Sequence, residues 1–234
     1  MASFRTIHDL GSDEVIINKS RFIGYASPIN SEDEAIEFIN KIRKKHSDAT
    51  HNVYAYVYGD NSNIQRFSDD GEPSGTAGMP VLNVIKLEDL RNVVVVVTRY
   101  YGGIKLGAGG LVRAYTKGAK IGLDSGIIVD KTLYYDVLVE IDYTLLGKIE
   151  NELTKNDYII KDKIFGESVT LNILCLEEDV EKLKSLILNT TSARCQIVLG
   201  ESSWYSIKDG KIISRWIFID TVIKYLCNFS RNEF

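Results

Sequence analysis

Hydrophobic and polar positions in the first half of the chain alternate between the periods of strands and of helices. Residues 93–97 are five consecutive valines, and the absence of polar alternation predicts a central strand that is covered on both faces. Residues 52–58 alternate small aliphatic side chains with Tyr54, Tyr56 and Tyr58, the period of a strand with two different faces. We expect the tyrosine face to pack under a helix. The alternative is a platform on which nucleic-acid bases stack.

A helix is predicted after Ser31, because apolar residues then recur every three or four positions. Glu34 follows Ser31 at the spacing of a capping box. The other elements expected in this half are one or two strands within residues 14–29 around a turn or bulge, a strand at 64–67, a short helix at 79–87 and a helix from about 109 to 123.

The second half of the chain predicts the order β-α-β-β-α-β. The expected elements are a strand within the strand-rich segment 127–142, a helix at 143–155, strands at 158–165 and 168–176, a helix at 178–189 and a strand at 194–200. This is the split βαβ arrangement of ferredoxin-like domains. We therefore expect an α+β protein with a first domain at 1–131, a second at 132–201, and a C-terminal extension, 202–234, of unassigned role.

A glycine-rich turn joins the valine strand to the helix that follows it. Its Gly107, Gly109 and Gly110 allow positive φ angles or a close approach of the backbone to a ligand, and the start of a helix offers unpaired N–H groups to anions. Residues 91–120 contain six basic and no acidic side chains, although the chain has a net charge of −4. These six cations are Arg91, Arg99, Lys105, Arg113, Lys117 and Lys120.

We interpret this stretch as a phosphate-binding surface for a nucleic acid or another phosphate-bearing partner. Four of its cations, Arg99, Lys105, Arg113 and Lys117, are the expected phosphate contacts. The alternative is ordinary strand–helix turn chemistry beside a solvated charged face, since glycine-rich turns are weak motifs.

An acidic loop precedes the valine strand and holds Asp69, Asp70 and Glu72. These carboxylates could bind Mg²⁺, which takes oxygen ligands, or pair with Arg99 or Arg113 and hold the loops together. We prefer the second role because it needs no cofactor. Ser74 and Thr76 are available to bind a phosphate or to cap the next helix. Ser74 has no histidine partner that the sequence indicates, so we assign no catalytic residue.

Other features of the sequence limit the classes of protein. His46, Asp48 and His51 are close in sequence, but no fourth ligand accompanies them, so we expect no metal site there. No apolar run approaches the roughly 20 residues of a membrane span, and the first residues lack the apolar region of a signal peptide. Three widely spaced cysteines suit a reducing compartment. We expect a cytoplasmic protein.

Two long and unusual blocks carry a resemblance to a known family. DDGEPSGTAGMP occupies residues 69–80 and VTRYYGGIKLGAGGLVRAY occupies residues 97–115, and both resemble the signature of the YigZ/IMPACT family. Residues 20–24 and 51–56 also fit its pattern. The resemblance implies a first domain similar to domain 2 of ribosomal protein S5. It also implies a ferredoxin-like second domain similar to the last domain of elongation factor G.

The resemblance favours a non-catalytic regulator that binds RNA or the ribosome through the basic glycine-rich stretch. Eukaryotic members are translation regulators that occupy the activator of a stress-responsive kinase, and a translation-control protein is therefore an expected partner. Those members carry an additional N-terminal domain, which we expect this chain to lack. Two alternatives stay open. One is an enzyme of the fold of GHMP small-molecule kinases acting on a nucleotide or phosphorylated metabolite, and the other is a protein-interaction module that uses the tyrosine face.

Overall fold

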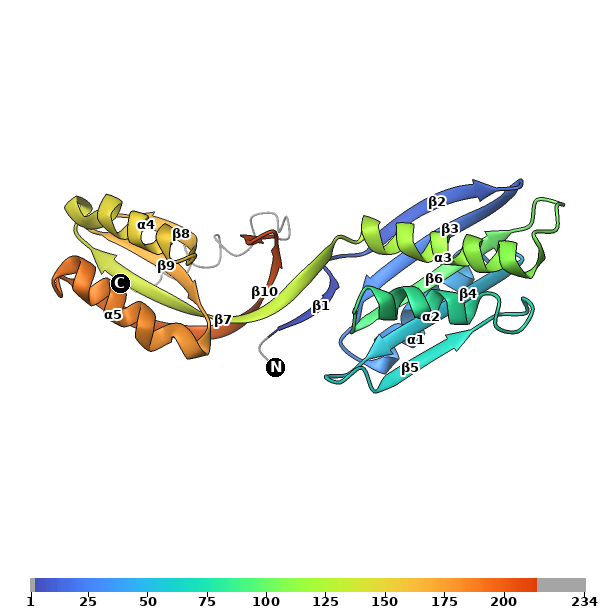
Figure 1. Ribbon diagram of the computed structural model, residues 1–234, viewed down its shortest axis with the longest axis horizontal. Helices are drawn as coiled ribbons and strands as arrows, with labels where there is room; N and C mark the ends of the chain where they lie inside the picture. The colour runs from blue at the N-terminus through green and yellow to red at the C-terminus, as the bar shows by residue number, and fades with distance from the viewer. Residues whose placement is uncertain (1–2, 214–234) are drawn as a thin grey trace, which may run out of the picture.

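The computed structural model describes residues 3–213 and has an α+β fold built on two antiparallel sheets. Figure 1 shows an elongated molecule in which the long strand β7 (Ile128–Ile141) connects two bodies. Between residues 3 and 213, no helix is long and apolar enough to cross a membrane. The α+β class expected from the sequence is confirmed.

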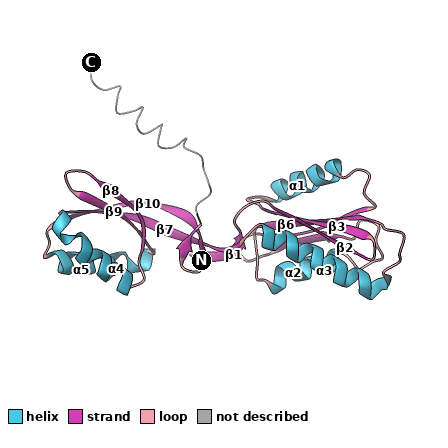
Figure 2. Ribbon diagram, turned by 90° about the horizontal axis from the view of Figure 1, so that it is seen from above, coloured by secondary structure: helices cyan, strands magenta, loops and turns pink. Residues whose placement is uncertain are grey.

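The first body is a five-stranded sheet with helices on both faces. The strand order is β2-β3-β6-β4-β5, and Figure 2 shows α1 on one face and α2 and α3 on the other. The strands are β2 (Gly11–Ile17), β3 (Ser20–Pro28), β4 (His51–Tyr58), β5 (Ile64–Ser68) and β6 (Val93–Tyr100). The helices are α1 (Glu32–Lys45), α2 (Gly78–Leu87) and α3 (Gly107–Ser125).

The valine run forms the middle of this sheet, as predicted. Successive side chains of a strand point to opposite faces. Val93, Val95 and Val97 therefore enter the core beneath α2 and α3, whereas Val94 and Val96 enter the core beneath α1. All five are fully buried, which explains why no polar residue interrupts the run.

The tyrosine face of β4 packs under α1, which confirms the expectation we preferred. Tyr56 is buried, and its hydroxyl donates to Glu32 Oε1 at 2.6 Å. Tyr54 and Tyr58 are partly buried against the same core. Ser31 caps α1 by accepting from the Glu34 backbone N–H at 3.1 Å. Because α1 packs against these rings, the tyrosine face offers only the partly exposed Tyr54 and Tyr58 to an interaction partner.

Glycines bring α3 unusually close to β3. A Cβ at Gly24 would lie 1.9 Å from the carbonyl oxygen of Gly118, and a Cβ at Gly122 would lie 2.9 Å from the backbone of Gly24. Such distances exclude any side chain at these positions, so backbone packs on backbone. This contact fixes the direction of α3 and hence the position of the glycine-rich turn at its start.

The second body carries the predicted β-α-β-β-α-β order on a sheet whose strands run β11-β10-β7-β9-β8, with β1 also paired to β7. Its core lies between this sheet and two helices, which cover one face (Figure 2). The further strands are β1 (Ser3–Ile7), β8 (Ile159–Phe165), β9 (Val169–Cys175), β10 (Cys195–Lys208) and β11 (Lys211–Ile212). The helices are α4 (Leu146–Lys155) and α5 (Val180–Thr191), each preceded by a single 3₁₀ turn, at Tyr143–Leu145 and Glu177–Asp179.

The last long strand differs from the sequence expectation. β10 does not end at residue 200 but continues through an irregularity between Leu199 and Ser202 and pairs with the first half of β7. A Cβ at Gly200 would lie 2.8 Å from the Asp136 carbonyl oxygen, so this glycine allows the bulge rather than ending the strand. Residues 202–212 of the expected extension thus belong largely to the sheet, and residues 214–234 lie outside the described part of the chain.

Candidate functional site

The three carboxylates of the acidic loop have separate structural partners. Asp69 accepts hydrogen bonds from the backbone N–H groups of Gly75, Ala77 and Gly78 at 2.8, 3.1 and 2.7 Å. These groups lie at the start of α2, whose own N-cap residue, Ala77, has no side chain that can cap. Asp69 therefore caps α2 from outside, where the helix dipole favours a negative charge.

Asp70 ties the same loop to β4 and α1. Its carboxylate accepts from the backbone N–H of Asn52 at 2.6 Å and from Arg43 Nη2 at 2.9 Å. Its carbonyl oxygen accepts a hydrogen bond from His51 Nδ1 at 2.7 Å. The loop is thus held on the end of the sheet through both the backbone and the side chain of one residue.

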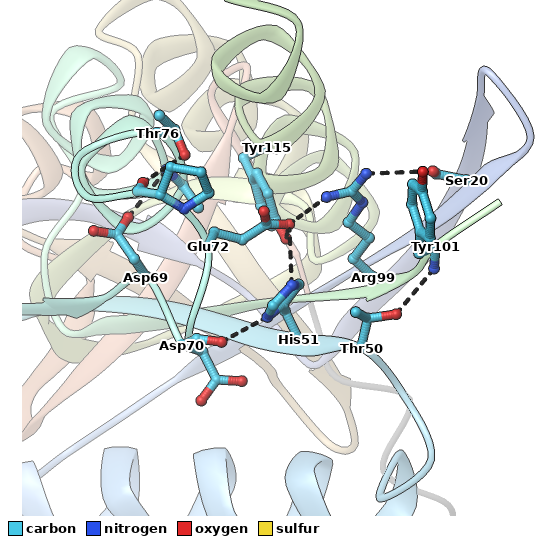
Figure 3. A network of polar contacts seen from close by, with 12 residues as sticks. Ser20, Thr50, His51, Asp69, Asp70, Glu72, Thr76, Arg99, Tyr101 and Tyr115 are labelled. Atoms are coloured by element: carbon cyan, nitrogen blue, oxygen red, sulfur yellow. Dashed lines mark hydrogen bonds and ion pairs between the residues drawn. The ribbon is translucent and has the colours of Figure 1, made fainter. Parts of the chain in front are cut away.

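Glu72 lies at the centre of a buried network, shown in Figure 3. Its Oε1 accepts from Arg99 Nη1 at 2.5 Å and from the Tyr115 hydroxyl at 2.8 Å, and His51 Nε2 lies 3.8 Å away. Burial, together with the neighbouring Glu72 carboxylate, raises the pKa of Tyr115, so its hydroxyl keeps the proton that it donates. Arg99 Nη2 also reaches Ser20 Oγ at 3.5 Å.

This geometry makes the acidic residues organisers of the loops. Glu72 pairs with Arg99, one of the two arginines considered from the sequence, whereas Arg113 forms no ion pair with any residue between 3 and 213. Within the described chain, no three His, Cys, Asp or Glu side chains are arranged to hold a metal ion. The hydroxyl of Thr76 is buried and donates to the Pro73 carbonyl oxygen at 2.6 Å, while Ser74 is exposed. Of these two hydroxyl side chains, only that of Ser74 is therefore accessible to a phosphate.

The glycine-rich turn begins tightly packed and then becomes open. Gly102 donates its N–H to Ser20 Oγ at 3.1 Å, and a Cβ there would lie 2.0 Å from the Lys19 carbonyl carbon. Gly103 and Gly107 have positive φ angles of 83° and 67°, and a Cβ at either position would meet nothing within 4 Å. α3 starts at Gly107, two residues earlier than expected, and no side chain of residues 3–213 caps it. Its first N–H groups therefore point into an open surface.

The six cations of residues 91–120 are divided by the fold. Arg91 is buried, lies 4.5 Å from the centroid of the Phe4 ring and donates to the Asp60 carbonyl oxygen. Lys120 pairs with Glu88 and Asp124 at 2.7 and 2.8 Å. Arg99, expected to contact phosphate, is instead 5% exposed and held by Glu72.

Three cations remain for a ligand, and none has an ion pair within residues 3–213: Lys105, Arg113 and Lys117. All three are exposed. Arg113 Nη1 would lie 3.7 Å from a Cβ at Gly109, so the guanidinium extends back along α3 towards its first turn. We call these cations, together with Gly107, Gly109 and Gly110, the glycine-turn surface.

Sequence reasoning missed the members of the network that carry no obvious charge signal. Tyr115 lies in the helix predicted from about 109 to 123, and Ser20 lies in the turn or bulge expected between the apolar groups of residues 14–29. The signal for Arg99 was present, because it continues the alternation of Val93, Val95 and Val97 and so had to face α3.

Two family profiles match this chain. The Impact N-terminal domain matches residues 18–123, which include the whole polar network and the glycine-turn surface, and a Domain of unknown function (DUF1949) matches residues 139–194. A solved structure described as that of a hypothetical protein is 32% identical, with a TM-score of 0.55, over 86% of this chain and 98% of that one.

Curated relatives carry the name of the family that the two sequence blocks resemble. IMPACT family member YigZ of Escherichia coli is 38% identical over 61% of this chain and 74% of the relative. Protein IMPACT-B of Xenopus tropicalis is 39% identical over 100 residues, which are 31% of that protein. IMPACT family member YvyE of Bacillus subtilis is 44% identical over 202 residues, 86% of this chain and 93% of the relative. With a match that spans nearly all of YvyE, the chain belongs to the IMPACT family.

Proposed function

We propose that this protein is a translation-associated regulator that binds RNA or the ribosome through the glycine-turn surface. The observation that carries the proposal is the uncapped start of the 19-residue helix α3, flanked by Lys105, Arg113 and Lys117. Backbone N–H groups and the positive end of a helix dipole bind phosphates, and exposed cations beside them add sequence-independent affinity. The positive charge is local, in a chain whose net charge is −4.

The topology and the relatives support a role in translation. The second body has the strand order β10-β7-β9-β8 and the element order β-α-β-β-α-β. Both suit a ferredoxin-like domain, which we propose is similar to the last domain of elongation factor G. In this proposal the first domain is similar to domain 2 of ribosomal protein S5. Relatives named IMPACT fit the family resemblance, and on that resemblance we propose a translation-control protein in the cytoplasm as a second partner.

The proposal includes no catalytic residue and no cofactor. An enzyme of the GHMP kinase fold would need free carboxylates for Mg²⁺ or for proton transfer. Asp69 and Asp70 are instead bound to backbone N–H groups, and Glu72 is bound to Arg99 and Tyr115. These contacts support a structural role for the acidic loop beside a binding surface.

Binding to ribosomes and to a structured RNA between about 50 and 300 mM salt tests the proposal. The variant carries Lys105→Ala, Arg113→Ala and Lys117→Ala, which leave the buried network intact. Three lost phosphate contacts should flatten the dependence of log K on log salt by about 2.7 on a duplex.

A control with the same change of charge is Lys44→Ala with Lys86→Ala and Lys182→Ala, all exposed and distant in sequence from the turn. This control should bind as the parent protein does. Absence of binding by the parent at about 50 mM salt, or an equal loss in the control, contradicts the proposal.

A further inference from the structure

An open groove of about 1510 Å³ lies between the two bodies of the molecule. One wall comes from the first body, including Phe38 and Lys41 of α1, and the other from residues 157–161 of the second. Residues 204–207 of β10 and 211–213 also line the groove. This volume exceeds the roughly 300–1,000 Å³ of most small-molecule pockets, so the groove suits a segment of a polymer.

Aromatic side chains from both bodies line the groove. They are Phe38, Tyr134, Tyr158, Trp204 and Tyr205. Trp204 is 46% exposed although it lies on a paired strand, and its ring is held by an edge contact with Phe4 at a centroid distance of 5.3 Å. A large aromatic ring that is oriented by the fold and open to solvent can stack on a nucleic-acid base without further ordering.

The charges of the groove favour an anionic occupant. Among the described residues, four lysines line it, Lys41, Lys131, Lys161 and Lys211, together with two acidic residues, Asp9 and Asp157. Lys161 is already bound to Asp136 and to the Tyr205 hydroxyl. Lys41 and Lys211 are exposed and form no ion pair in the described part of the chain, and they come from α1 and β11. Two cations supplied by different elements can contact different phosphates of one strand.

We propose that this groove binds a segment of single-stranded nucleic acid, with a base stacked on Trp204 and phosphates at Lys41 and Lys211. Stacking requires an exposed base face, which a duplex does not present along its length. The groove is separate from the glycine-turn surface, because no residue of that surface lines it. The two sites therefore bind or fail independently.

Fluorescence of Trp204 provides a direct measurement. The chain has two tryptophans, so Trp216→Phe leaves Trp204 as the only one. A single-stranded oligouridine of about eight nucleotides, within the usual range of roughly 4–16 for such sites, should quench this emission in a saturable manner. A duplex of the same length should leave the emission unchanged.

Fluorescence polarisation of a labelled oligouridine then measures how much each contact contributes to the binding affinity. Trp204→Ala should weaken binding about 5- to 150-fold through loss of stacking on one base. Lys41→Ala with Lys211→Ala should flatten the dependence of log K on log salt by about 1.4. Lys44→Ala with Lys182→Ala removes the same charge outside the groove and should change neither quantity. The variant with Lys105→Ala, Arg113→Ala and Lys117→Ala should retain the quenching. This result would distinguish binding in the groove from binding at the glycine-turn surface.

Three results would overturn the proposal. The first is no change in Trp204 emission with single strands at about 50 mM salt. The second is an equal response to the duplex. The third is a flattening of the salt dependence in the Lys44→Ala with Lys182→Ala control that equals the flattening in the Lys41→Ala with Lys211→Ala variant.

Discussion

Replacing Arg99 with alanine distinguishes a structural arginine from a ligand-binding one. The substitution removes the donor that lies 2.5 Å from Glu72 Oε1, while the carboxylate stays buried beside Tyr115. The side chains of Arg99 and Glu72 are 6% and 4% exposed, so solvent cannot replace the lost partner of Glu72. Removing one member of a buried ion pair destabilises a protein by roughly 3–5 kcal/mol, because the other charge stays desolvated.

The structure places the expected loss towards the lower end of this range. Arg99 also lies 5.4 Å from the centroids of the Phe22 and Tyr101 rings, and these contacts add to the loss. Its buried Nε, however, has no hydrogen-bond partner among the described residues, and this unsatisfied group already weakens the native state. Arg99→Ala should therefore cost about 3 kcal/mol, whereas the exposed Arg113→Ala should stay within about 0.5 kcal/mol of the parent protein.

Urea denaturation followed by circular dichroism measures the free energy of unfolding of both variants. Hydrogen exchange of β3 and β6 amides then locates the loss in the first body of the molecule. A double replacement, Glu72→Leu with Arg99→Leu, should recover part of the stability because it leaves no unpaired buried charge. The reasoning is refuted if Arg99→Ala is as stable as Arg113→Ala and loses RNA binding, since Arg99 would then be a ligand contact.

Three further substitutions test other contacts. Asp69→Ala removes the external cap of α2 and should cost about 1–2 kcal/mol in urea denaturation, with Asp69→Asn retaining part of the stability. Burial lowers the pKa of His46, so its contribution to stability is complete above about pH 6.5 and decreases as the pH falls below that value. His46→Gln should therefore lose less stability between about pH 7.5 and pH 5.5 than the parent protein. Gly109→Ala should stabilise α3 by up to about 1 kcal/mol and weaken RNA binding in the salt titration.

Local periodicity predicted those elements whose burial follows directly from it. The valine run, the capped helix after Ser31 and the β-α-β-β-α-β order of the second body all lie where their patterns indicated. Each of these signals is contained within a few neighbouring residues, so no knowledge of distant partners was needed. The side-chain alternation that begins at Val93 even fixes the face on which Arg99 lies.

Charge counting along the sequence was less informative, because it cannot separate a buried cation from an exposed one. Arg91, Arg99 and Lys120 find partners that lie far along the chain or across the fold, such as Glu72 and Glu88. The length of β10 was missed for a related reason. Ser202 and Ser203 have the polarity of a loop, yet they pair with the first half of β7, which is a distant partner.

The glycines near the start of α3 point to the role of this surface. Gly102 is required by packing, and Gly107 is required by its positive φ angle. Gly109 has neither requirement, because its φ angle is not positive and a Cβ there would meet only the mobile end of Arg113 at 3.7 Å. A glycine in a helix costs up to about 1 kcal/mol relative to alanine. The described fold does not account for a glycine at position 109. The proposed function does, because a phosphate would approach the backbone there, beside the uncapped N–H groups and the cations Lys105, Arg113 and Lys117.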